Sequence, residues 1–415
     1  MSGAPLSVDE QTRILTAGCV DVISEADLRE RLASAVSEKR PLRIKLGVDP
    51  TASDIHLGFA VVLAKLRQFQ DLGHVAVLII GDFTAMVGDP TGRSATRPRL
   101  SRAEVDGHAA TYIDQVGAIL NLDPARIEVR RNSEWLEALG MEDILRLTGS
   151  TTVARMLERN DFATRYAQGV GISLTELLYP LLQGWDSVQV RADVELGGTD
   201  QLFNNLVGRQ LQQQDGQPPQ IVLTTPLLEG LDGVQKMSKS LGNFIGVSEP
   251  AAEMFGKVMS IPDKVVPRWL ELTTRWHPDE VEEAVADFSV GDGPTRNGLK
   301  RRLARRIVDL YHDPGAGSLA ESEFNRVFKQ DAPPSDTPIV RLGAKEFPMP
   351  LWRLVVRCDL APSNKQARRL VRQGAVKLDG APRADEETPV SAADVDGRRL
   401  QAGKRRWAAI EVAES

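Results

Sequence analysis

The chain has 415 residues, of which 42% are hydrophobic and 26% are charged, and its formal net charge is −6. This composition is ordinary for a globular protein and excludes a disordered or collagen-like chain. One compact core rarely extends over this length, so we expect two or three domains.

Cysteine usage and the absence of long apolar runs predict the compartment. Cys19 and Cys358 are far apart, so we expect no disulfide framework and no structural metal cluster. The first 25 residues lack the apolar core of a signal peptide, and the longest apolar run, 75–80, is too short to cross a bilayer. We therefore expect a cytoplasmic protein with no membrane association.

The charge is unevenly distributed along the chain. Residues 351–415 hold 13 Lys or Arg against 9 Asp or Glu, a balance of +4, whereas the other 350 residues hold 38 against 48, a balance of −10. A basic C-terminal segment on an acidic body indicates an appended nucleic-acid-binding module. A solvated surface that happens to be basic would have the same charge.

Hydrophobic periodicity predicts an alternation of helices and strands over the first 230 residues. The expected elements in chain order are helical residues 1–40 with Ser24 as an N-cap, a strand at 42–48, a helix at 58–72, a strand at 75–80, a helix near 102–120, a strand near 127–130, helices between 134 and 189, a strand at 193–196, a helix at 200–213 and a strand at 221–224. Strand–helix–strand units of this kind form right-handed parallel crossovers. The sequence therefore predicts an α/β fold with a Rossmann-type, doubly wound parallel sheet.

Beyond residue 230 the strand signals nearly vanish. Residues 249–261, 278–288 and 294–312 have the periodicity of amphipathic helices, and proline-rich residues 330–348 are typical of a linker. The C-terminal segment has the pattern of a compact α+β module. We therefore predict four parts, which are a Rossmann-type domain at 1–230, a lysine-containing loop and helical domain at 231–330, a linker at 331–349 and an α+β domain at 350–415.

Two distant motifs carry the chemistry. Lys-Met-Ser-Lys-Ser at 236–240 lies between Gly233 and Gly242, which favours a mobile cationic loop suited to a polyphosphate. His-Leu-Gly at 56–58 opens a helix, where unpaired backbone N–H groups and the helix dipole attract anions. Taken singly, a lysine loop is more often a solvated turn and a histidine before a helix is more often a cap. Their joint occurrence in this order favours a nucleotide site.

Together the two motifs resemble those of class I aminoacyl-tRNA synthetases. Tyr-Pro-Leu-Leu-Gln-Gly-Trp-Asp at 179–186 narrows the resemblance to the tyrosyl-tRNA synthetase family, and Lys-Leu-Gly-Val-Asp-Pro-Thr at 45–51 is similar to its second bacterial type. The resemblance covers nearly the whole chain. It implies that L-tyrosine and ATP form tyrosyl-adenylate and pyrophosphate, after which tyrosine passes to the 3′-terminal adenosine of tRNA(Tyr).

The implied first step is attack of a carboxylate on the α-phosphate of ATP. This step needs in-line positioning and cations near the leaving phosphates rather than a covalent nucleophile. The resemblance implies the catalytic residues Thr51, His56, Lys236 and Lys239. It implies the ATP-binding residues His56, Gly58, Gly198, Asp200, Lys236, Lys239 and Ser240, with Asp200 on the ribose. Mg²⁺ is expected to enter as part of the ATP substrate.

The amino-acid pocket is expected on one helix. Tyr179, Gln183 and Asp186 stand at i, i+4 and i+7 and therefore share a helix face. On spacing alone, a half-buried helix with a capping aspartate explains the pattern as well. The resemblance implies the tyrosine-binding residues Asp89, Tyr179, Gln183, Asp186 and Gln201, with Asp186 on the phenolic hydroxyl. A buried polar site that requires a substrate hydroxyl rejects the analogue without it, and this family is itself a known example.

Two positions depart from the family pattern. Phe59 stands where the family usually has a second motif histidine, and its helical spacing favours an apolar packing residue. Lys45 stands where the common bacterial branch has a tyrosine that contacts the substrate hydroxyl. Lys45 either pairs with a carboxylate of the pocket or points away on an edge strand.

The C-terminal module contains a predicted basic helix. Ser363 is its expected N-cap, and its basic residues lie opposite an apolar stripe. The pattern resembles the small RNA-binding domain first seen in ribosomal protein S-four, and it also fits a helix whose arginines only confer solubility. The resemblance implies the RNA-binding residues Lys365, Arg368, Arg369 and Arg372.

The resemblance also implies the partners. It predicts a homodimer that binds tRNA(Tyr) across its subunits, with the helical domain on the anticodon and the C-terminal module on the long variable arm. Two other functions stay open from the sequence. One is a tryptophan-specific relative, and the other is a catalytically idle RNA-binding paralogue, for which Phe59 is the argument.

Overall fold

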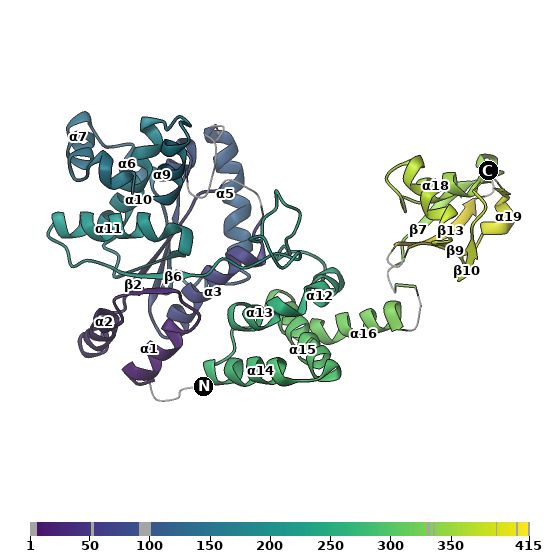
Figure 1. Cartoon of the computed structure of the whole chain (residues 1–415), viewed down its shortest axis with the longest axis horizontal. Helices are drawn as coiled ribbons and strands as arrows, with labels where there is room; N and C mark the ends of the chain where they lie inside the picture. Colours follow the sequence, from purple (N-terminus) through teal and green to yellow (C-terminus); the bar gives the residue numbers. More distant parts are fainter. Residues whose placement is uncertain are drawn as a thin grey trace. The chain divides into compact units, whose positions relative to one another are not determined.

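The computed structural model describes residues 6–50, 54–90, 101–329, 333–334, 337–386, 388–403 and 406–413. Thr51, one of the predicted catalytic residues, lies outside these ranges. The chain divides into two compact units, residues 1–317 and residues 318–415. Figure 1 shows the elements of both units along the chain.

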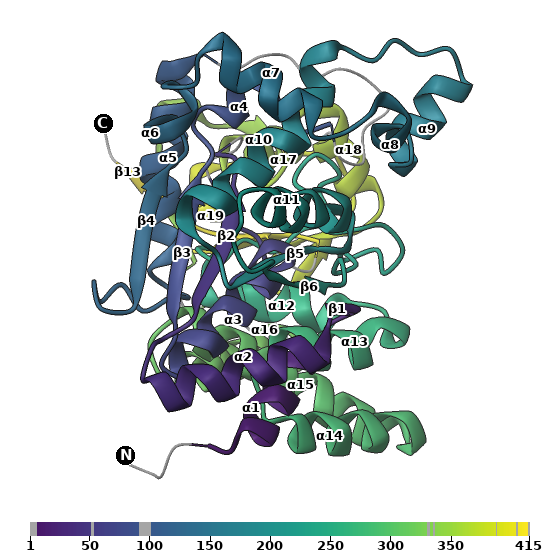
Figure 2. The same ribbon diagram turned by 90° about the vertical axis from the view of Figure 1, so that its left-hand side faces the viewer.

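A six-stranded sheet forms the centre of the first unit. Its strands are β1 (Asp21–Ile23), β2 (Arg43–Val48), β3 (Val75–Ile80), β4 (Ile127–Arg131), β5 (Val194–Gly198) and β6 (Ile221–Thr225). They lie in the order β1-β6-β5-β2-β3-β4, and Figure 2 shows β4, β3, β2, β5 and β6 side by side. All neighbouring pairs are parallel except β1 with β6. The predicted doubly wound α/β sheet is confirmed.

Helices connect and cover these strands. They are α1 (Val8–Thr16), α2 (Glu25–Glu38), α3 (Leu57–Asp71), α4 (Thr84–Val87), α5 (Arg102–Val116), α6 (Ser133–Leu136), α7 (Met141–Gly149), α8 (Val153–Met156), α9 (Asn160–Ala167), α10 (Leu174–Val190), the 3-10 turn η1 (Thr199–Gln201) and α11 (Leu202–Gln214). Ser24 caps α2 as predicted, because its hydroxyl accepts a hydrogen bond from Asp27 N at 3.2 Å. The prediction of one helical stretch over 1–40 is wrong at 21–23, where β1 pairs with the sheet edge.

The sheet has a reversal of strand order between β2 and β5. From β2 the chain proceeds to β3 and β4 on one side, whereas β5 and β6 lie on the other. Ligands of doubly wound sheets bind at the carboxyl ends of the strands at such a reversal. Here β2 runs into Asp49 and the start of α3, while β5 runs into Gly198 and η1.

Helices α10 and α11 cross closely beside this reversal. A Cβ atom on Gly184 of α10 would lie 3.1 Å from the backbone N of Gly208 on α11. A Cβ on Gly208 would lie 2.7 Å from Ser187 Oγ and 3.1 Å from Glu195 Oε2. The two glycines therefore let the polar side of α10 reach the buried part of β5.

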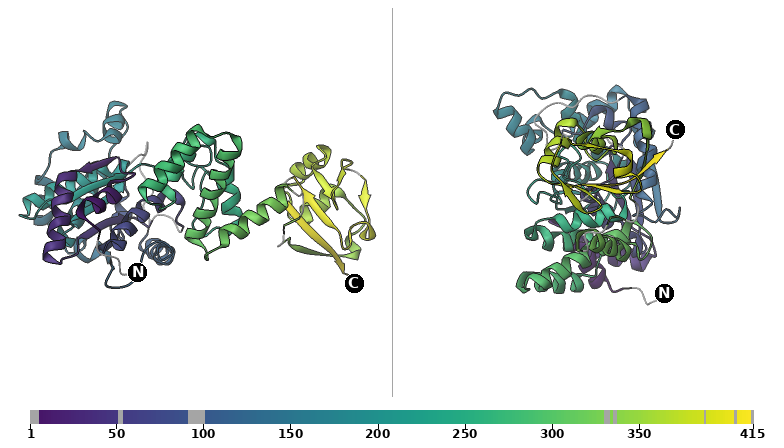
Figure 3. Two further views of the ribbon diagram at one scale, coloured as in Figure 1. Left: turned by 90° about the horizontal axis from the view of Figure 1, so that it is seen from below. Right: turned by 90° about the vertical axis from the view of Figure 1, so that its right-hand side faces the viewer.

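After the sheet, the first unit continues as helices. These are α12 (Ala251–Ser260), the 3-10 turn η2 (Asp263–Val265), α13 (Val266–Thr273), α14 (Pro278–Val290) and α15 (Gly293–Tyr311), which Figure 3 shows gathered in green. The three predicted helices correspond to α12, α14 and α15. Helix α13, which the sequence analysis missed, is only 8 residues long and buries Trp269 completely, so tertiary packing stabilises it.

The second unit contains helix α16 (Ala316–Lys329), which begins at the boundary, and a five-stranded sheet in the order β10-β9-β12-β13-β7. Its strands are β7 (Ile339–Gly343), β9 (Val376–Leu378), β10 (Ala381–Arg383), β12 (Arg399–Ala402) and β13 (Arg406–Ala413). The other elements are η3 (Ala344–Glu346), β8 (Met349–Pro350), α17 (Leu351–Arg357), α18 (Asn364–Arg372), β11 (Pro389–Val390) and α19 (Ala392–Val395). The predicted linker thus contains β7, which pairs in parallel with β13.

Packing around Leu354 and Val355 of α17, Val371 of α18 and Leu400 of β12 forms the core of this unit. Each such fully buried side chain contributes roughly 1.5–3 kcal/mol relative to an exposed one. Within the described ranges, no helix is long and apolar enough to cross a membrane.

Candidate active site

A cavity of about 540 Å³ lies at the carboxyl ends of β2 and β5. The start of α3, with His56 and Gly58, lines one side of it, and the lysine loop 236–240 lines another. The face of α10 that carries Tyr179 also opens into it. Folding therefore brings the two distant sequence motifs into one cavity.

The lysine loop and the residues that follow it, 245–246, contact the start of α3. Leu57 N donates to Ile245 O at 2.9 Å, and His56 pairs with Gly246 in an isolated β-bridge. Gly58 N donates to the thioether Sδ of Met237 at 3.2 Å. At the N-terminus of α3, where an anion would be attracted, the amide of Gly58 is thus covered by a weakly accepting sulfur atom.

Both lysines of the loop face carboxylates on the rim of the cavity. Lys239 Nζ lies 2.7 Å from Asp54 Oδ2, and Lys236 Nζ lies 3.6 Å from Asp200 Oδ2. Because the side chains are partly exposed, each pair contributes at most about 1 kcal/mol. Burial raises the pKa of Asp200, and the nearby Lys236 opposes that rise. A ligand with several phosphate oxygens could replace these carboxylates as partner of the two ammonium groups.

His56 is held in its neutral form. It occupies the N-cap position of α3 in extended conformation, and its ring Nδ1 is buried without a hydrogen-bond partner. Burial lowers the pKa of His56 to about 4, and the charge of Lys239 acts in the same direction. Near neutral pH the ring can therefore contribute a hydrogen bond but not a positive charge.

Phe59 packs as its helical spacing predicts. Its ring meets Tyr112 of α5 edge to face, with ring centroids 5.6 Å apart. Both rings also line the cavity, so this position supplies apolar surface where the family pattern has a histidine.

A hydrogen-bonded cluster forms the inner end of the cavity. The hydroxyl of Tyr179 donates to Asp49 Oδ2 at 2.9 Å, and the hydroxyl of Thr84 donates to Asp49 Oδ1 at 2.7 Å. Burial, reinforced by nearby Asp49 and Asp89, raises the pKa of Tyr179 well above its usual value, so its phenol stays protonated.

A chain of amides connects the other predicted tyrosine-binding residues. Gln201 Nε2 donates to Asp89 Oδ2 at 2.9 Å. Asn204 Nδ2 donates to Gln201 Oε1 at 3.1 Å and to Gln183 Oε1 at 3.0 Å. Asp89, Gln183 and Gln201 thus lie in one cluster, and Asn204, which the sequence analysis missed, links them.

Asp186 is buried, with 3% of its surface exposed, and still lines the cavity. It accepts hydrogen bonds from Trp135 Nε1 at 2.7 Å and from Asn132 Nδ2 at 3.3 Å. Burial raises its pKa to about 7, against the opposing charge of Lys45 and these two donors. Its helix face was predicted, but its two partners were not, because they follow β4, far away in sequence.

Lys45 does not lie on an edge strand. Strand β2 is central in the sheet, and the Lys45 side chain is completely buried. Its Nζ lies 2.8 Å from Glu195 Oε1 on the neighbouring strand β5. Of the two predicted alternatives, pairing with a carboxylate is observed, although Glu195 is not among the described residues that line the cavity.

Asp49 and Glu195 are site residues that the sequence analysis did not select. A signal for Asp49 was present, because it directly follows β2 and thus the carboxyl end of a parallel strand. Glu195 lies inside an otherwise apolar buried strand, where a carboxylate requires a partner.

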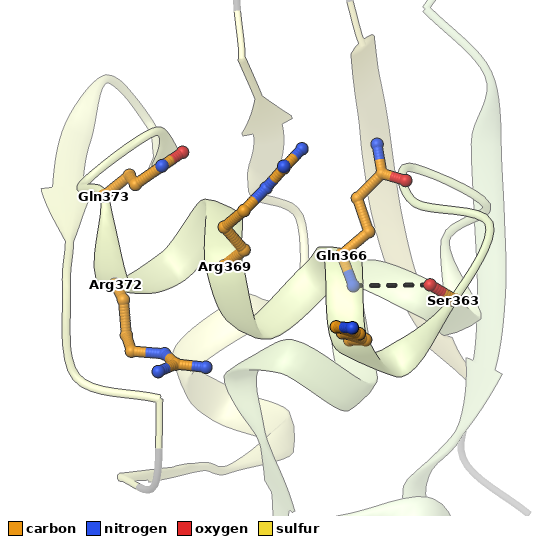
Figure 4. A pocket seen from close by; sticks show the side chains of 6 residues that line it. Ser363, Gln366, Arg369, Arg372 and Gln373 are labelled. Atoms are coloured by element: carbon orange, nitrogen blue, oxygen red, sulfur yellow. Dashed lines mark hydrogen bonds between the residues drawn. The ribbon is translucent and has the colours of Figure 1, made fainter.

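In the second unit, α18 presents a basic surface. Ser363 Oγ caps the helix by accepting from Gln366 N at 3.3 Å, and Figure 4 shows Arg369 and Gln366 extending from the same side of α18. A shallow hollow of about 530 Å³ is lined by Ser363, Lys365, Gln366, Arg369, Arg372 and Gln373.

The other two predicted RNA-binding arginines also have protein partners. Arg368 lies over the ring of Trp352, 4.5 Å from its centroid. Arg372 Nε lies 3.1 Å from Glu386 Oε2. Lys365 and Arg369 are therefore the better candidates for direct phosphate contacts.

Family models identify the class of protein. Residues 37–329 match the model described as tRNA synthetases class I (W and Y), and residues 349–396 match the S4 domain model. Because the first match covers more than half of the chain, the protein belongs to the class I tRNA synthetases of the tryptophan and tyrosine group.

Full-length relatives show that the chain belongs to the tyrosine–tRNA ligase family within this class. The tyrosine–tRNA ligase of Moorella thermoacetica is 50% identical over 405 residues, which cover 98% of this chain and 96% of the relative. The tyrosine–tRNA ligase of Syntrophotalea carbinolica is 50% identical over 413 residues, which cover 98% of this chain and 99% of the relative.

Solved structures agree with this fold. A C-terminally truncated Aspergillus nidulans mitochondrial tyrosyl-tRNA synthetase has a TM-score of 0.62 and 24% identity, and the match covers 79% of this chain and 95% of that one. The Archaeoglobus fulgidus tyrosyl-tRNA synthetase complexed with L-tyrosine has a TM-score of 0.59 and 24% identity, with coverage of 76% and 99%. At this identity the likeness establishes the fold alone.

Half-buried His56 and buried His74 predict a loss of stability in mild acid. Burial lowers the pKa of both His56 and His74 to about 4, and His74 Nδ1 accepts a hydrogen bond from Leu42 N at 3.2 Å. Between pH 6.5 and 5 the unfolded chain therefore binds more protons than the folded chain. The free energy of unfolding should fall with decreasing pH, by up to about 1.4 kcal/mol per pH unit for each histidine.

Urea denaturation at a fixed protein concentration measures this slope. His56→Asn should reduce the slope, and His56→Asn/His74→Asn should reduce it further, since asparagine can accept the same backbone hydrogen bond at position 74. The raised pKa values of Asp186 and Asp200 act in the opposite direction, so the comparison between parent and variants is the test. Equal slopes in the parent and the double variant would contradict the assignment.

Proposed function

We propose that the protein is a tyrosine–tRNA ligase that activates L-tyrosine with MgATP and then esterifies tRNA(Tyr). The names of the full-length relatives support this function. The observation that carries it is the convergence of His56, the lysine loop and the polar face of α10 on one cavity. That cavity combines a polyphosphate-binding rim with a hydroxyl-recognising interior.

ATP would occupy the rim. Its triphosphate would face the N-terminus of α3, with His56 and Gly58, and the two ammonium groups of Lys236 and Lys239. Ser240 would add a hydroxyl, and Thr51 remains part of the proposal from the sequence alone. Gly198 would allow the ribose to approach closely, and the ribose hydroxyls would donate hydrogen bonds to Asp200. Mg²⁺ would arrive with ATP and share the charge of its phosphates.

Tyrosine would occupy the interior. Its ammonium would bind near Asp89, Tyr179, Gln183 and Gln201, and its phenolic hydroxyl would donate to Asp186. The tyrosine carboxylate would then point to the rim and attack the α-phosphate in line. The lysines would stabilise the charge that develops on the departing pyrophosphate, so this step needs no covalent enzyme intermediate. The ester bond to tRNA would form from the adenylate in the same cavity.

We also propose that the four predicted parts have separate roles. Residues 1–230 would carry catalysis, the helices of 231–330 would bind the anticodon, 331–349 would be a linker, and 350–415 would bind RNA. The S4 match at 349–396 and the basic surface of α18 support the last assignment. We also propose a cytoplasmic location, which the proposed use of tRNA as a substrate supports.

A homodimer is supported by an apolar surface on the first unit. Helices α7 to α10 carry large hydrophobic side chains that are each at least 64% exposed, namely Met141, Leu145, Val153, Tyr166 and Leu174. A second copy of the chain would cover these exposed apolar side chains.

Lysine substitutions test the ATP site. Lys236→Ala and Lys239→Ala should each lower kcat/KM for tyrosine-dependent ATP–pyrophosphate exchange by roughly 10²- to 10³-fold, because a preorganised donor to the developing charge is lost. The control Lys345→Ala changes an exposed lysine of the second unit and should leave exchange unchanged.

The same exchange assay separates the competing functions. A parent protein that exchanges pyrophosphate with tryptophan but not tyrosine would be the tryptophan-specific relative. No exchange with either amino acid would leave only the idle RNA-binding protein. The S4 match and the relatives' names favour the tyrosine enzyme.

The proposed dimer surface predicts an oligomeric state. One chain has a mass of 45.4 kDa, and light scattering coupled to gel filtration should give twice this mass. Leu145→Asp and Leu174→Asp should yield monomers, because burying a carboxylate in an apolar interface is costly. The matched control Val290→Asp alters an exposed valine on α14, outside this surface, and should remain dimeric. Dimers that persist in both leucine variants would place the interface elsewhere.

Salt dependence tests the RNA surface. Lys365→Ala and Arg369→Ala should each weaken binding of tRNA(Tyr) and reduce the slope of log affinity against log salt by about 1. Arg341→Ala is a suitable control, since Arg341 is exposed in the same unit and pairs with Glu411 on β13. Equal salt slopes in all four proteins would exclude α18 as a phosphate-binding surface.

A further inference from the structure

Lys45 and Glu195 form a buried ion pair beside the proposed tyrosine pocket. Lys45 is 0% exposed and Glu195 is 1% exposed. The two residues are direct partners in the register of the neighbouring parallel strands β2 and β5, and Lys45 Nζ lies 2.8 Å from Glu195 Oε1. The pairing of the two central strands therefore fixes the position of both charges.

The remaining hydrogen bonds of Lys45 go to α10. Its Nζ donates to the backbone oxygen of Gln183 at 2.8 Å and to Ser187 Oγ at 2.6 Å. Together with Glu195, these acceptors use all three N–H groups of the ammonium. Asp186 lies on the same turn of α10, between the two residues that Lys45 holds.

Glu195 is equally well bonded. Its Oε2 accepts from Ser187 Oγ at 3.1 Å and from Gln220 Nε2, and its Oε1 accepts from Gln183 Nε2 at 3.3 Å. A buried ion pair is tolerated when such bonds satisfy both charges, and breaking one partner is costly.

The charged groups that face Asp186 come from several elements. Lys45 on β2 lowers the pKa of Asp186, and Glu195 on β5 raises it. Tyr179 on α10 also faces this carboxyl, with a protonated phenol. Trp135 and Asn132 add neutral donors. Burial raises the pKa of Asp186 to about 7 although Lys45 and the two donors oppose the rise, and Glu195 adds to it. Removing either charge should therefore change the ionised fraction of Asp186 near neutral pH.

Lys45 does not contact the cavity itself. Among the residues that the structure describes, those lining the cavity include its strand neighbours Leu46 and Gly47 but not Lys45. Its ammonium has no N–H group left for a substrate. Any effect on the reaction must therefore pass through α10.

We propose that Lys45 is a positioning residue for tyrosine recognition. It fixes the Gln183–Ser187 turn of α10 and favours the charged form of Asp186 as the acceptor of the substrate hydroxyl, and Glu195 opposes this charge effect. This inference rests on the proposed tyrosine ligase function. In the family's common bacterial branch, a tyrosine at this position contacts the substrate hydroxyl. Here Lys45 would act on the recognition of that hydroxyl indirectly, through Asp186.

The pH dependence of kcat/KM for tyrosine tests the proposal, because this ratio reports ionisations of the free enzyme. The parent should have an acidic limb centred near pH 7 in the exchange assay. Lys45→Met should move this limb upward by about one pH unit or more, since a close opposite charge shifts a carboxyl pKa by roughly 1–3 units. Activity at pH 7 should then fall about 10-fold and recover at higher pH.

Glu195→Gln should move the limb in the opposite direction, to lower pH, because it removes the charge that opposes ionisation of Asp186. Lys45→Met/Glu195→Gln removes both charges, so it should fold most readily, and its limb should lie above that of the parent and below that of Lys45→Met. If the single variants fail to fold, the double variant alone decides.

Lys65→Met provides the matched control. Lys65 is a second buried lysine of the same unit, whose Nζ donates to the backbone oxygen of Ala17 at 2.8 Å, away from the cavity of the site. It should leave the limb in place. Unchanged limbs, or equal loss of activity at every pH in the Lys45 variants, would overturn the proposal. An inactive parent would instead refute the ligase function.

Discussion

The reversal of strand order between β2 and β5 is the constraint on which the site depends. It leaves a gap above the carboxyl ends of two adjacent parallel strands, where no crossover helix passes. The start of α3, the η1 turn and α10 all reach this gap from different parts of the chain. Neither motif of the sequence would form a site without that topology, because each supplies only one wall.

The same two strands also carry the charges that the sheet core would ordinarily exclude. Placing Lys45 and Glu195 on adjacent strands of a parallel sheet costs desolvation energy, which their mutual attraction and further hydrogen bonds offset. The close crossing of α10 and α11 at Gly184 and Gly208 makes this possible, since it brings the hydroxyl of Ser187 within reach of both charges. Packing and electrostatics of the interior are thus coupled.

Sequence patterns predicted the parallel sheet and the long helices well, because strong hydrophobic runs such as 75–80 leave little choice of structure. Short elements were missed where tertiary contacts determine them, as with β1, which pairs only with the distant β6, and β7, which pairs with β13. The helix face of Tyr179 and Asp186 was predictable from spacing. Trp135, Asn132 and Glu195 were not, since their contacts to α10 depend on how separate segments meet.

Strand β7 has a practical consequence for dissecting this protein. It forms one edge of the C-terminal sheet and covers the longer strand β13 by running alongside it from Ile339 to Gly343. A fragment started at the family-model boundary near residue 349 would leave the backbone amides and carbonyls of β13 open to intermolecular strand addition. A C-terminal fragment that folds by itself should therefore begin upstream of Pro338, within the residues that the sequence predicts as a linker.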